Sequence, residues 1–213
     1  MIRTVSLNLL LIGAWVYGQK SFEGSLTFTT KLEGAMASQM EEMLKGQLPE
    51  RMITYYRGNK SRSEVGDMTI IVDGDAGYIY ALNPALQSYQ RSPIQPPQQD
   101  QPQPKITRTK EKTKILGQSV EKYMVEVPTD QGTVKMEIWA APSLKVSETL
   151  GRTNALTRGA KVEGLPLRIS MDVPGMDLKI IFLATQISQT PPDEALFRIP
   201  EGYVEDKSGG SDE

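Results

Sequence analysis

Apolar and polar residues alternate along much of the chain. In residues 22–31, Phe22, Leu26 and Phe28 alternate with Glu23, Ser25 and Thr27, and this period of two predicts a half-buried strand. Similar short segments, bounded by Gly, Asn, Asp and Pro turns, lie at 52–57, 60–65, 68–72, 77–82, 86–91, 105–116, 119–127, 133–140, 165–173 and 178–187. Such spacing predicts sequential antiparallel hairpins. The last segment contains Ile-Ile-Phe-Leu at 180–183, apolar on both faces, and is expected inside the sheet.

The pattern changes to a helical period in residues 35–48. Apolar side chains recur there at helical spacing, at Met36, Met40, Met43, Leu44 and Leu48. This stripe predicts an amphipathic helix, which Pro49 ends because proline cannot continue the hydrogen-bond ladder. Residues 142–157 fit a helix only loosely and include Gly151, so helix and irregular structure are both open.

These elements predict a mainly β (α+β) fold. A sheet of about ten strands tends to curl, so we expect a large curved antiparallel sheet that forms a half-barrel around one or two helices. Residues 19–204 are predicted to form one domain. Residues 93–104, rich in Pro and Gln, are expected to be an exposed loop, and the acidic tail at 205–213 is expected to be disordered.

The first eighteen residues have the features of a secretory signal peptide. Arg3 supplies a cationic start and residues 5–16 are mostly apolar. This run is shorter than the roughly 20 residues of a transmembrane helix. We therefore expect an exported protein, periplasmic or secreted.

The composition excludes several classes of chemistry. The chain has no His and no Cys, and so lacks the usual general base, a common transition-metal ligand, a thiolate and any disulfide. Asp73-Gly74-Asp75 fits either a calcium loop or a hairpin turn, and lacks the remaining ligands of an EF-hand. The net charge of −2 gives no reason to expect nucleic acid as a partner. We predict no enzymatic activity, no metal and no cofactor.

Four short segments together resemble a known family. They are Phe22-Glu23-Gly24, Tyr55-Tyr56-Arg57-Gly58-Asn59-Lys60-Ser61-Arg62, Gly164-Leu165-Pro166-Leu167 and Phe197-Arg198-Ile199-Pro200-Glu201-Gly202-Tyr203. In them the chain resembles a bacterial family of secreted proteins of unknown function, itself similar to the periplasmic lipoprotein carriers of the LolA-like superfamily. The resemblance implies a half-barrel with an apolar cavity for acyl chains, and a role in handling lipid or lipoprotein.

Two sets of residues are candidates for ligand contact. The expected cavity residues are Met36, Met40, Met43, Leu44, Phe28, Ile180 and Phe182, because flexible methionines suit varied apolar ligands. The alternative for the methionine stripe is a core helix that fills the concave sheet. The expected contacts to anionic headgroups or a membrane surface are Arg108, Lys110, Lys112 and Lys114, which alternation places on one face of a strand. The alternative is a lysine-rich edge strand that discourages aggregation.

Two functions remain open at this point. One is binding of a lipid or lipidated partner in the cavity of the curved sheet. The other is a structural or protein-interaction module of the cell envelope without a ligand. The sequence predicts nothing about the oligomeric state.

Overall fold

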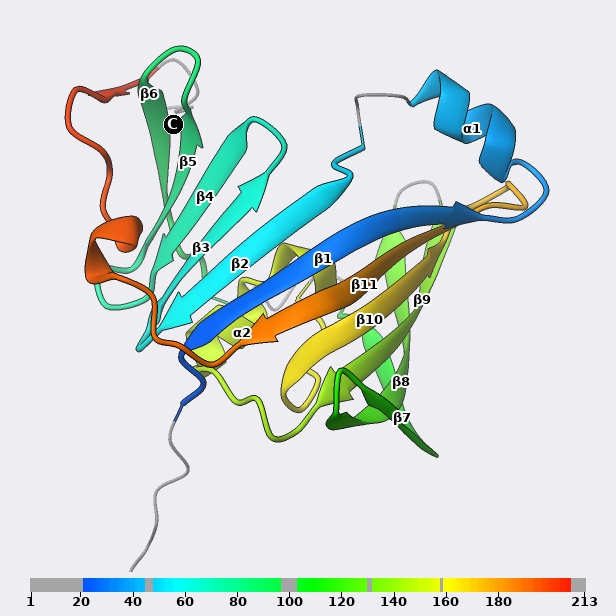
Figure 1. Ribbon diagram of the computed structural model, residues 1–213. Helices are drawn as coiled ribbons and strands as arrows, with labels where there is room; N and C mark the ends of the chain where they lie inside the picture. Colours follow the sequence, from blue (N-terminus) through cyan, green and yellow to red (C-terminus); the bar gives the residue numbers. More distant parts are fainter. Residues whose placement is uncertain (1–20, 45–47, 97–102, 130–131, 158, 208–213) are drawn as a thin grey trace, which may run out of the picture.

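One large sheet organises the protein. The structure is a computed structural model, and it describes residues 21–44, 48–96, 103–129, 132–157 and 159–207. Within these ranges twelve strands form a single sheet in the order β12-β6-β5-β4-β3-β2-β1-β11-β10-β9-β8-β7. The sheet is open and strongly curved (Figure 1). The expected half-barrel fold is therefore confirmed.

The strands match the predicted segments closely. The first meander comprises β1 (Gly24–Glu33), β2 (Arg51–Arg57), β3 (Lys60–Val65), β4 (Met68–Asp73), β5 (Tyr78–Asn83) and β6 (Ser88–Pro93). The second comprises β7 (Lys105–Ile115), β8 (Gln118–Thr129), β9 (Gly132–Ala141), β10 (Leu165–Asp172) and β11 (Lys179–Ser188). The short β12 (Val204–Glu205) pairs with β6 and is parallel to it, whereas the other paired strands are antiparallel. The helices are α1 (Ala37–Met43) and α2 (Glu148–Arg152), with 3-10 turns η1 (Ala155–Thr157) and η2 (Glu194–Phe197).

The seam between β1 and β11 joins the two meanders. Phe28 lies opposite Ala184 and Leu32 opposite Ile180, and a register shift between Thr27 and Phe28 marks an irregularity in the pairing. The strand β11 lies inside the sheet, between β1 and β10, as its apolar sequence predicts.

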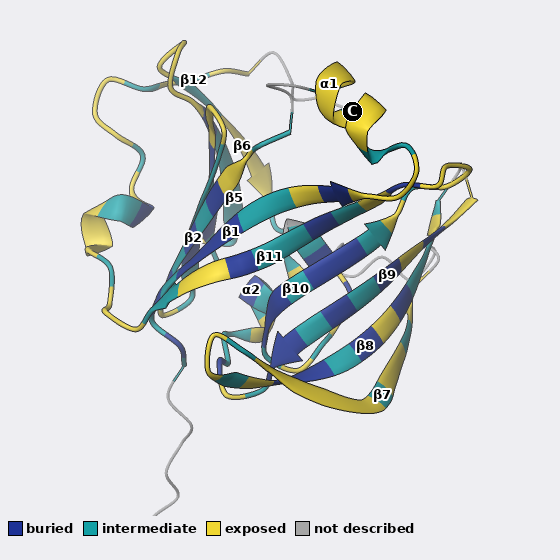
Figure 2. Cartoon of the chain, turned by 45° about the vertical axis from the view of Figure 1, so that its right-hand side comes forward, coloured by how far each residue is buried: buried dark blue, intermediate teal, exposed yellow. Residues whose placement is uncertain are grey.

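The sheet curves around α2 rather than around the methionine helix. Leu150 of α2 is 3% exposed and belongs to one buried cluster with Phe28 and Leu165. Leu156 and Val162 pack against a second cluster, formed on β8, β9 and β10. Residues 144–157, part of the stretch 142–157 that the sequence left open between helix and irregular structure, thus fill the concave side together with residues 159–162 (Figure 2).

The methionine helix is shorter than predicted and lies at the end of β1. None of the residues of α1 is buried (Figure 2). Backbone hydrogen bonds from Ala35 to Asp177 Oδ2 (3.2 Å) and from Met36 to the Asp177 carbonyl (3.3 Å) tie its start to the β10–β11 turn. The interpretation of the methionine stripe as a core helix is therefore wrong, because Leu150, Leu156 and Val162 already occupy the concave side.

Three predicted features lie wholly or partly outside the described residues. The signal peptide at 1–18, residues 97–102 of the Pro/Gln-rich loop and residues 208–213 of the tail lie outside the described residues. Among the helices that are described, none has the length and hydrophobicity needed to cross a bilayer.

Candidate ligand cavity

A cavity of 1310 Å³ lies beside the segment that fills the half-barrel. Its walls come from the end of β8, from residues 145–166, and from both ends of the linker between β6 and β7. The apolar part of the lining includes Val127, Pro128, Val146, Ala160, Val162 and Leu165. Ligand pockets commonly measure about 300–1,000 Å³. The cavity is therefore large enough for an extended amphiphile.

The topology of the sheet explains one wall. Strand β6 lies next to one edge of the sheet and β7 forms the other edge, yet they are consecutive in the chain. Ile94, just after β6, donates its N–H to the Gly77 carbonyl (2.9 Å) and packs against the core. Gln95 and Pro96 at this end, and Gln103 and Pro104 at the other, then line the cavity. The Pro/Gln-rich linker is thus anchored at its start.

The opposite wall is fixed by hydrogen bonds at both of its ends. Ser147 caps α2 by accepting a hydrogen bond from the Leu150 N–H (3.3 Å). Leu165, where the chain re-enters the sheet, donates its N–H to the Leu144 carbonyl (2.9 Å). Gly164 has a φ of +86°, and a Cβ there would lie 1.9 Å from the Ala141 carbonyl oxygen. Only glycine fits this close approach, which holds the wall against β9.

The charged residues on the walls form two groups. In the first, Lys161 pairs with Glu148 (2.8 Å), and Arg152 lies four residues after Glu148 on the same short helix. The hydrogen bond from Lys161 is the main reason that the pKa of Glu148 lies below its ordinary value, and the positive charge of Arg152 contributes. Arg152 itself forms no ion pair with a described residue.

In the second group Glu163 is shared by two cations. Its carboxylate lies 3.6 Å from Lys145 Nζ and 3.5 Å from Arg108 Nη1. Lys145 and Glu163 both line the cavity. Each cavity carboxylate therefore already interacts with two cations.

The cavity residues predicted from the sequence do not line this space. Phe28 is buried in the sheet, and Ile180 and Phe182 are half-buried and lie two residues apart on β11. Met36, Met40 and Leu44 are half-buried, and Met43 is 60% exposed. Leu44 instead lines a smaller cavity of 250 Å³ beside β1, together with Leu32 and Leu48. The structure thus separates the methionine helix from Phe28 and Phe182.

The valines that do line the cavity gave little signal in the sequence. Val127 lies near the end of β8, whereas Val146 and Val162 lie in the segment between β9 and β10. Neither a period of two nor a helical period connects them. Only the anchoring of that segment inside the half-barrel brings them together.

The cationic residues of β7 lie on an edge strand, as one of the two interpretations predicts. A register shift between Arg108 and Lys112 interrupts the alternation that would place all four cations on one face. Arg108 and Lys112 both pair with Glu121, which lowers the pKa of that carboxyl, mainly through the hydrogen bond from Lys112. Lys110 and Lys114 form no ion pair with a described residue.

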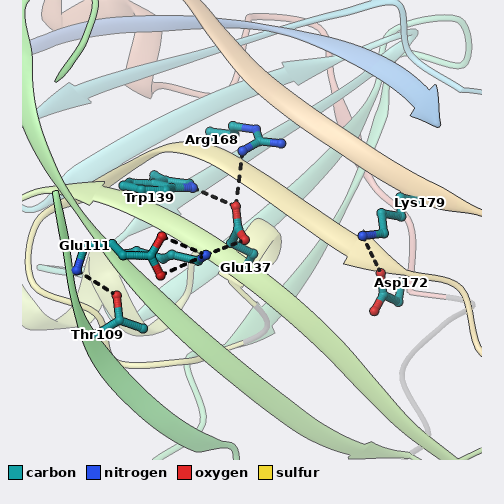
Figure 3. Close-up of polar contacts among 8 residues, drawn as sticks. Thr109, Glu111, Glu137, Trp139, Arg168, Asp172 and Lys179 are labelled. Carbon is teal, nitrogen blue, oxygen red and sulfur yellow. Dashed lines mark hydrogen bonds and ion pairs between the residues drawn. The ribbon is translucent and has the colours of Figure 1, made fainter. Parts of the chain in front are cut away.

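A separate polar cluster is shared by β8, β9 and β10 (Figure 3). Glu137 accepts hydrogen bonds from Trp139 Nε1 (2.7 Å) and Arg168 Nη1 (3.1 Å), and pairs with Lys122 (3.0 Å). Burial would raise the pKa of Glu137, but the hydrogen bonds from Trp139 and Lys122 outweigh it and lower the pKa below the ordinary 4.5. Lys122 also pairs with Glu111 (3.2 Å). These groups satisfy one another, so we assign the cluster a structural role.

The described part of the chain contains no group of acidic residues that could hold a metal ion. Asp73 instead closes a turn, since its Oδ1 accepts the N–H groups of Asp75 (3.1 Å) and Ala76 (2.9 Å). This arrangement fits the hairpin-turn interpretation of the Asp-Gly-Asp sequence.

Comparisons with known proteins identify a family and similar structures. A family model described as a domain of unknown function, DUF4412, matches residues 22–203. The resemblance to a family of unknown function, expected from the sequence, is confirmed. No curated protein matches the sequence.

Three of the solved structures that are similar to this chain share little sequence identity with it. An uncharacterized conserved protein from Thermus thermophilus is 12% identical, with a TM-score of 0.50 over 87% of this chain and 91% of the other, and supports the fold. PNGF-II is 13% identical, with a TM-score of 0.49 over 87% of this chain. The matched part covers only 32% of PNGF-II. A domain from Vibrio parahaemolyticus, named for outer membrane lipoprotein sorting, is 12% identical with a TM-score of 0.32 over 83% of this chain and 89% of that domain.

Proposed function

The chain belongs to the DUF4412 family, and we propose that it is an exported binding protein that holds the acyl chain of a lipid or lipidated partner in the 1310 Å³ cavity. The observation that carries this proposal is the position of the cavity. It lies on the concave side of a half-barrel, between the described ends of the linker at 95–96 and 103–104 and the segment around α2.

The lining supports an amphiphilic ligand. Val127, Val146 and Val162 offer apolar surface, and burial of such surface contributes about 25 cal/mol per Å² before the costs of binding. Glu148 and Lys161 place charges on the same walls. An apolar chain with a polar end fits this combination better than a wholly apolar or wholly polar molecule.

Binding rather than catalysis is part of the proposal. The chain has no His or Cys, and the two carboxylates that line the cavity, Glu148 and Glu163, are ion-paired. The hydrogen bond from Lys161 also lowers the pKa of Glu148, which makes this carboxyl a poor proton donor near neutral pH. Export is proposed from the sequence features of residues 1–18 alone.

Lipid analysis and probe uptake test the proposal directly. The mature protein is purified from its native envelope without detergent, and an organic extract is examined by mass spectrometry. We expect a stoichiometric lipid. The stripped protein should also enhance the fluorescence of the neutral apolar probe N-phenyl-1-naphthylamine.

A pair of variants localises the binding. Val146 and Val65 are both half-buried and pack against the same cluster, but only Val146 lines the cavity. We expect Val146→Phe to reduce probe binding because the larger side chain fills cavity volume, and Val65→Phe to leave it unchanged. A protein without lipid that also fails to take up the probe would refute the proposal and favour the ligand-free interaction module.

A further inference from the structure

The charge on the cavity walls is unbalanced. Each wall carboxylate interacts with two cations: Glu148 with Lys161 and Arg152, and Glu163 with Lys145 and Arg108. Three of these cations, Lys145, Arg152 and Lys161, line the cavity, against the two carboxylates. The excess of positive charge therefore comes from the first group, because Arg108 of the second group does not line the cavity.

Arg152 is the least satisfied of the cavity cations. Lys161 Nζ lies 2.8 Å from Glu148, and Lys145 Nζ lies 3.6 Å from Glu163. Arg152 makes no ion pair with a described residue, although its guanidinium carries five N–H donors. A guanidinium matches the geometry of carboxylate and phosphate groups. An anion placed at this wall would gain a charged partner without breaking an existing pair.

We propose that the cavity selects amphiphiles with an anionic headgroup, a carboxylate or a phosphate monoester, and that Arg152 is the main headgroup contact. The acyl chain lies along Val127, Val146 and Val162, and the headgroup lies at the cationic wall. This inference rests on the proposed function, because it assigns the polar end of the same ligand.

Competition between matched amphiphiles tests the inference. The neutral probe N-phenyl-1-naphthylamine is bound to the full mature protein and displaced by dodecanoate, dodecyl phosphate or dodecanol, which share one chain and differ in the headgroup. We expect at least one anionic amphiphile to displace the probe at about one tenth of the dodecanol concentration, a typical gain for a charge-assisted hydrogen bond. The stronger of dodecanoate and dodecyl phosphate identifies the headgroup class, and inorganic phosphate should not displace the probe.

Variants at two exposed arginines assign the effect. Arg152→Gln should remove the tenfold preference for the anionic amphiphile over dodecanol, and Arg152→Lys should retain part of this preference because it keeps the charge. Arg198→Gln is the matched control, since Arg198 is also exposed but does not line the cavity. Because these residues are exposed, all three variants should keep the thermal midpoint of the parent protein.

The two proposals can fail separately. If dodecanol competes as well as both anionic amphiphiles, or if Arg152→Gln keeps the preference, the headgroup inference is refuted while an apolar carrier remains. Displacement by inorganic phosphate alone would also refute it, because the site would then bind a free anion. If neither the probe nor any amphiphile binds, the proposed function itself is overturned.

Discussion

Replacing Leu150 with alanine tests whether α2 occupies the interior of the half-barrel. Leu150 is 3% exposed and belongs to a buried cluster with Leu144 and Leu165. Buried Leu→Ala changes cost about 2.7–5 kcal/mol, and the value depends on how far the site relaxes. Because α2 has five residues and borders a cavity, we expect a loss near the lower end, about 3 kcal/mol. For a domain of this size, that loss lowers the thermal midpoint by about 6–12 °C.

Met43→Ala is the matched control in the other helix. Met43 is 60% exposed, so its truncation should change the free energy of unfolding by less than about 0.5 kcal/mol. Urea denaturation followed by circular dichroism measures the free energy of unfolding of both variants. The dependence of this free energy on urea concentration reports the surface that unfolding exposes. Equal losses for Leu150→Ala and Met43→Ala would refute the assignment of α2 to the core.

Three further outcomes follow from the polar and glycine positions. The pKa of Glu137 is lowered in the folded state, so its carboxylate stabilises the fold above about pH 4.5, and this contribution is lost as the pH falls through the folded pKa. The difference in thermal midpoint between the parent protein and Glu137→Gln should therefore become smaller on acidification, and a difference that stays constant would contradict this reasoning. Gly164→Ala should lower the free energy of unfolding, measured by urea denaturation, by about 3 kcal/mol or more, because a Cβ would lie 1.9 Å from a carbonyl oxygen. Gly117→Ala is the control and should lower it by about 1 kcal/mol, since Gly117 has a φ of +78° but open space around a Cβ. Reversing both Lys110 and Lys114 to Glu should weaken co-sedimentation with phosphatidylglycerol vesicles, and unchanged binding would mean that these lysines only protect the sheet edge.

The strands were predictable because the chain marks their ends clearly. Residues 60–65 were expected as a strand and form β3 (Lys60–Val65), since glycine turns at Gly58 and Gly66 flank them. Alternation and turn chemistry are local properties, and antiparallel hairpins pair neighbouring segments. The order of strands within each of the two meanders follows from this rule alone.

The site was less predictable because it depends on contacts between distant segments. A stripe such as Met36, Met40 and Met43 shows that one helix face is apolar, but not which element it meets. The interior was instead filled by residues around Leu150, where the helical pattern is weak. A register shift in β7 likewise cannot be read from alternating charges, because it appears only when the pairing with β8 is known.

The seam between β1 and β11 sets the order in which the chain can fold. Ser25 at the start of the sheet pairs with Ser188 near its end, whereas β2 to β6 and β7 to β11 pair with neighbours in the sequence. Local hairpins form quickly, but pairing of distant strands carries a large entropy cost of loop closure. The two meanders can therefore form early, and the sheet is completed only when the last long strand is available. A chain with this connectivity therefore keeps the facing edges of β1 and β11 unpaired, and open to pairing with other strands, until nearly all of it is available.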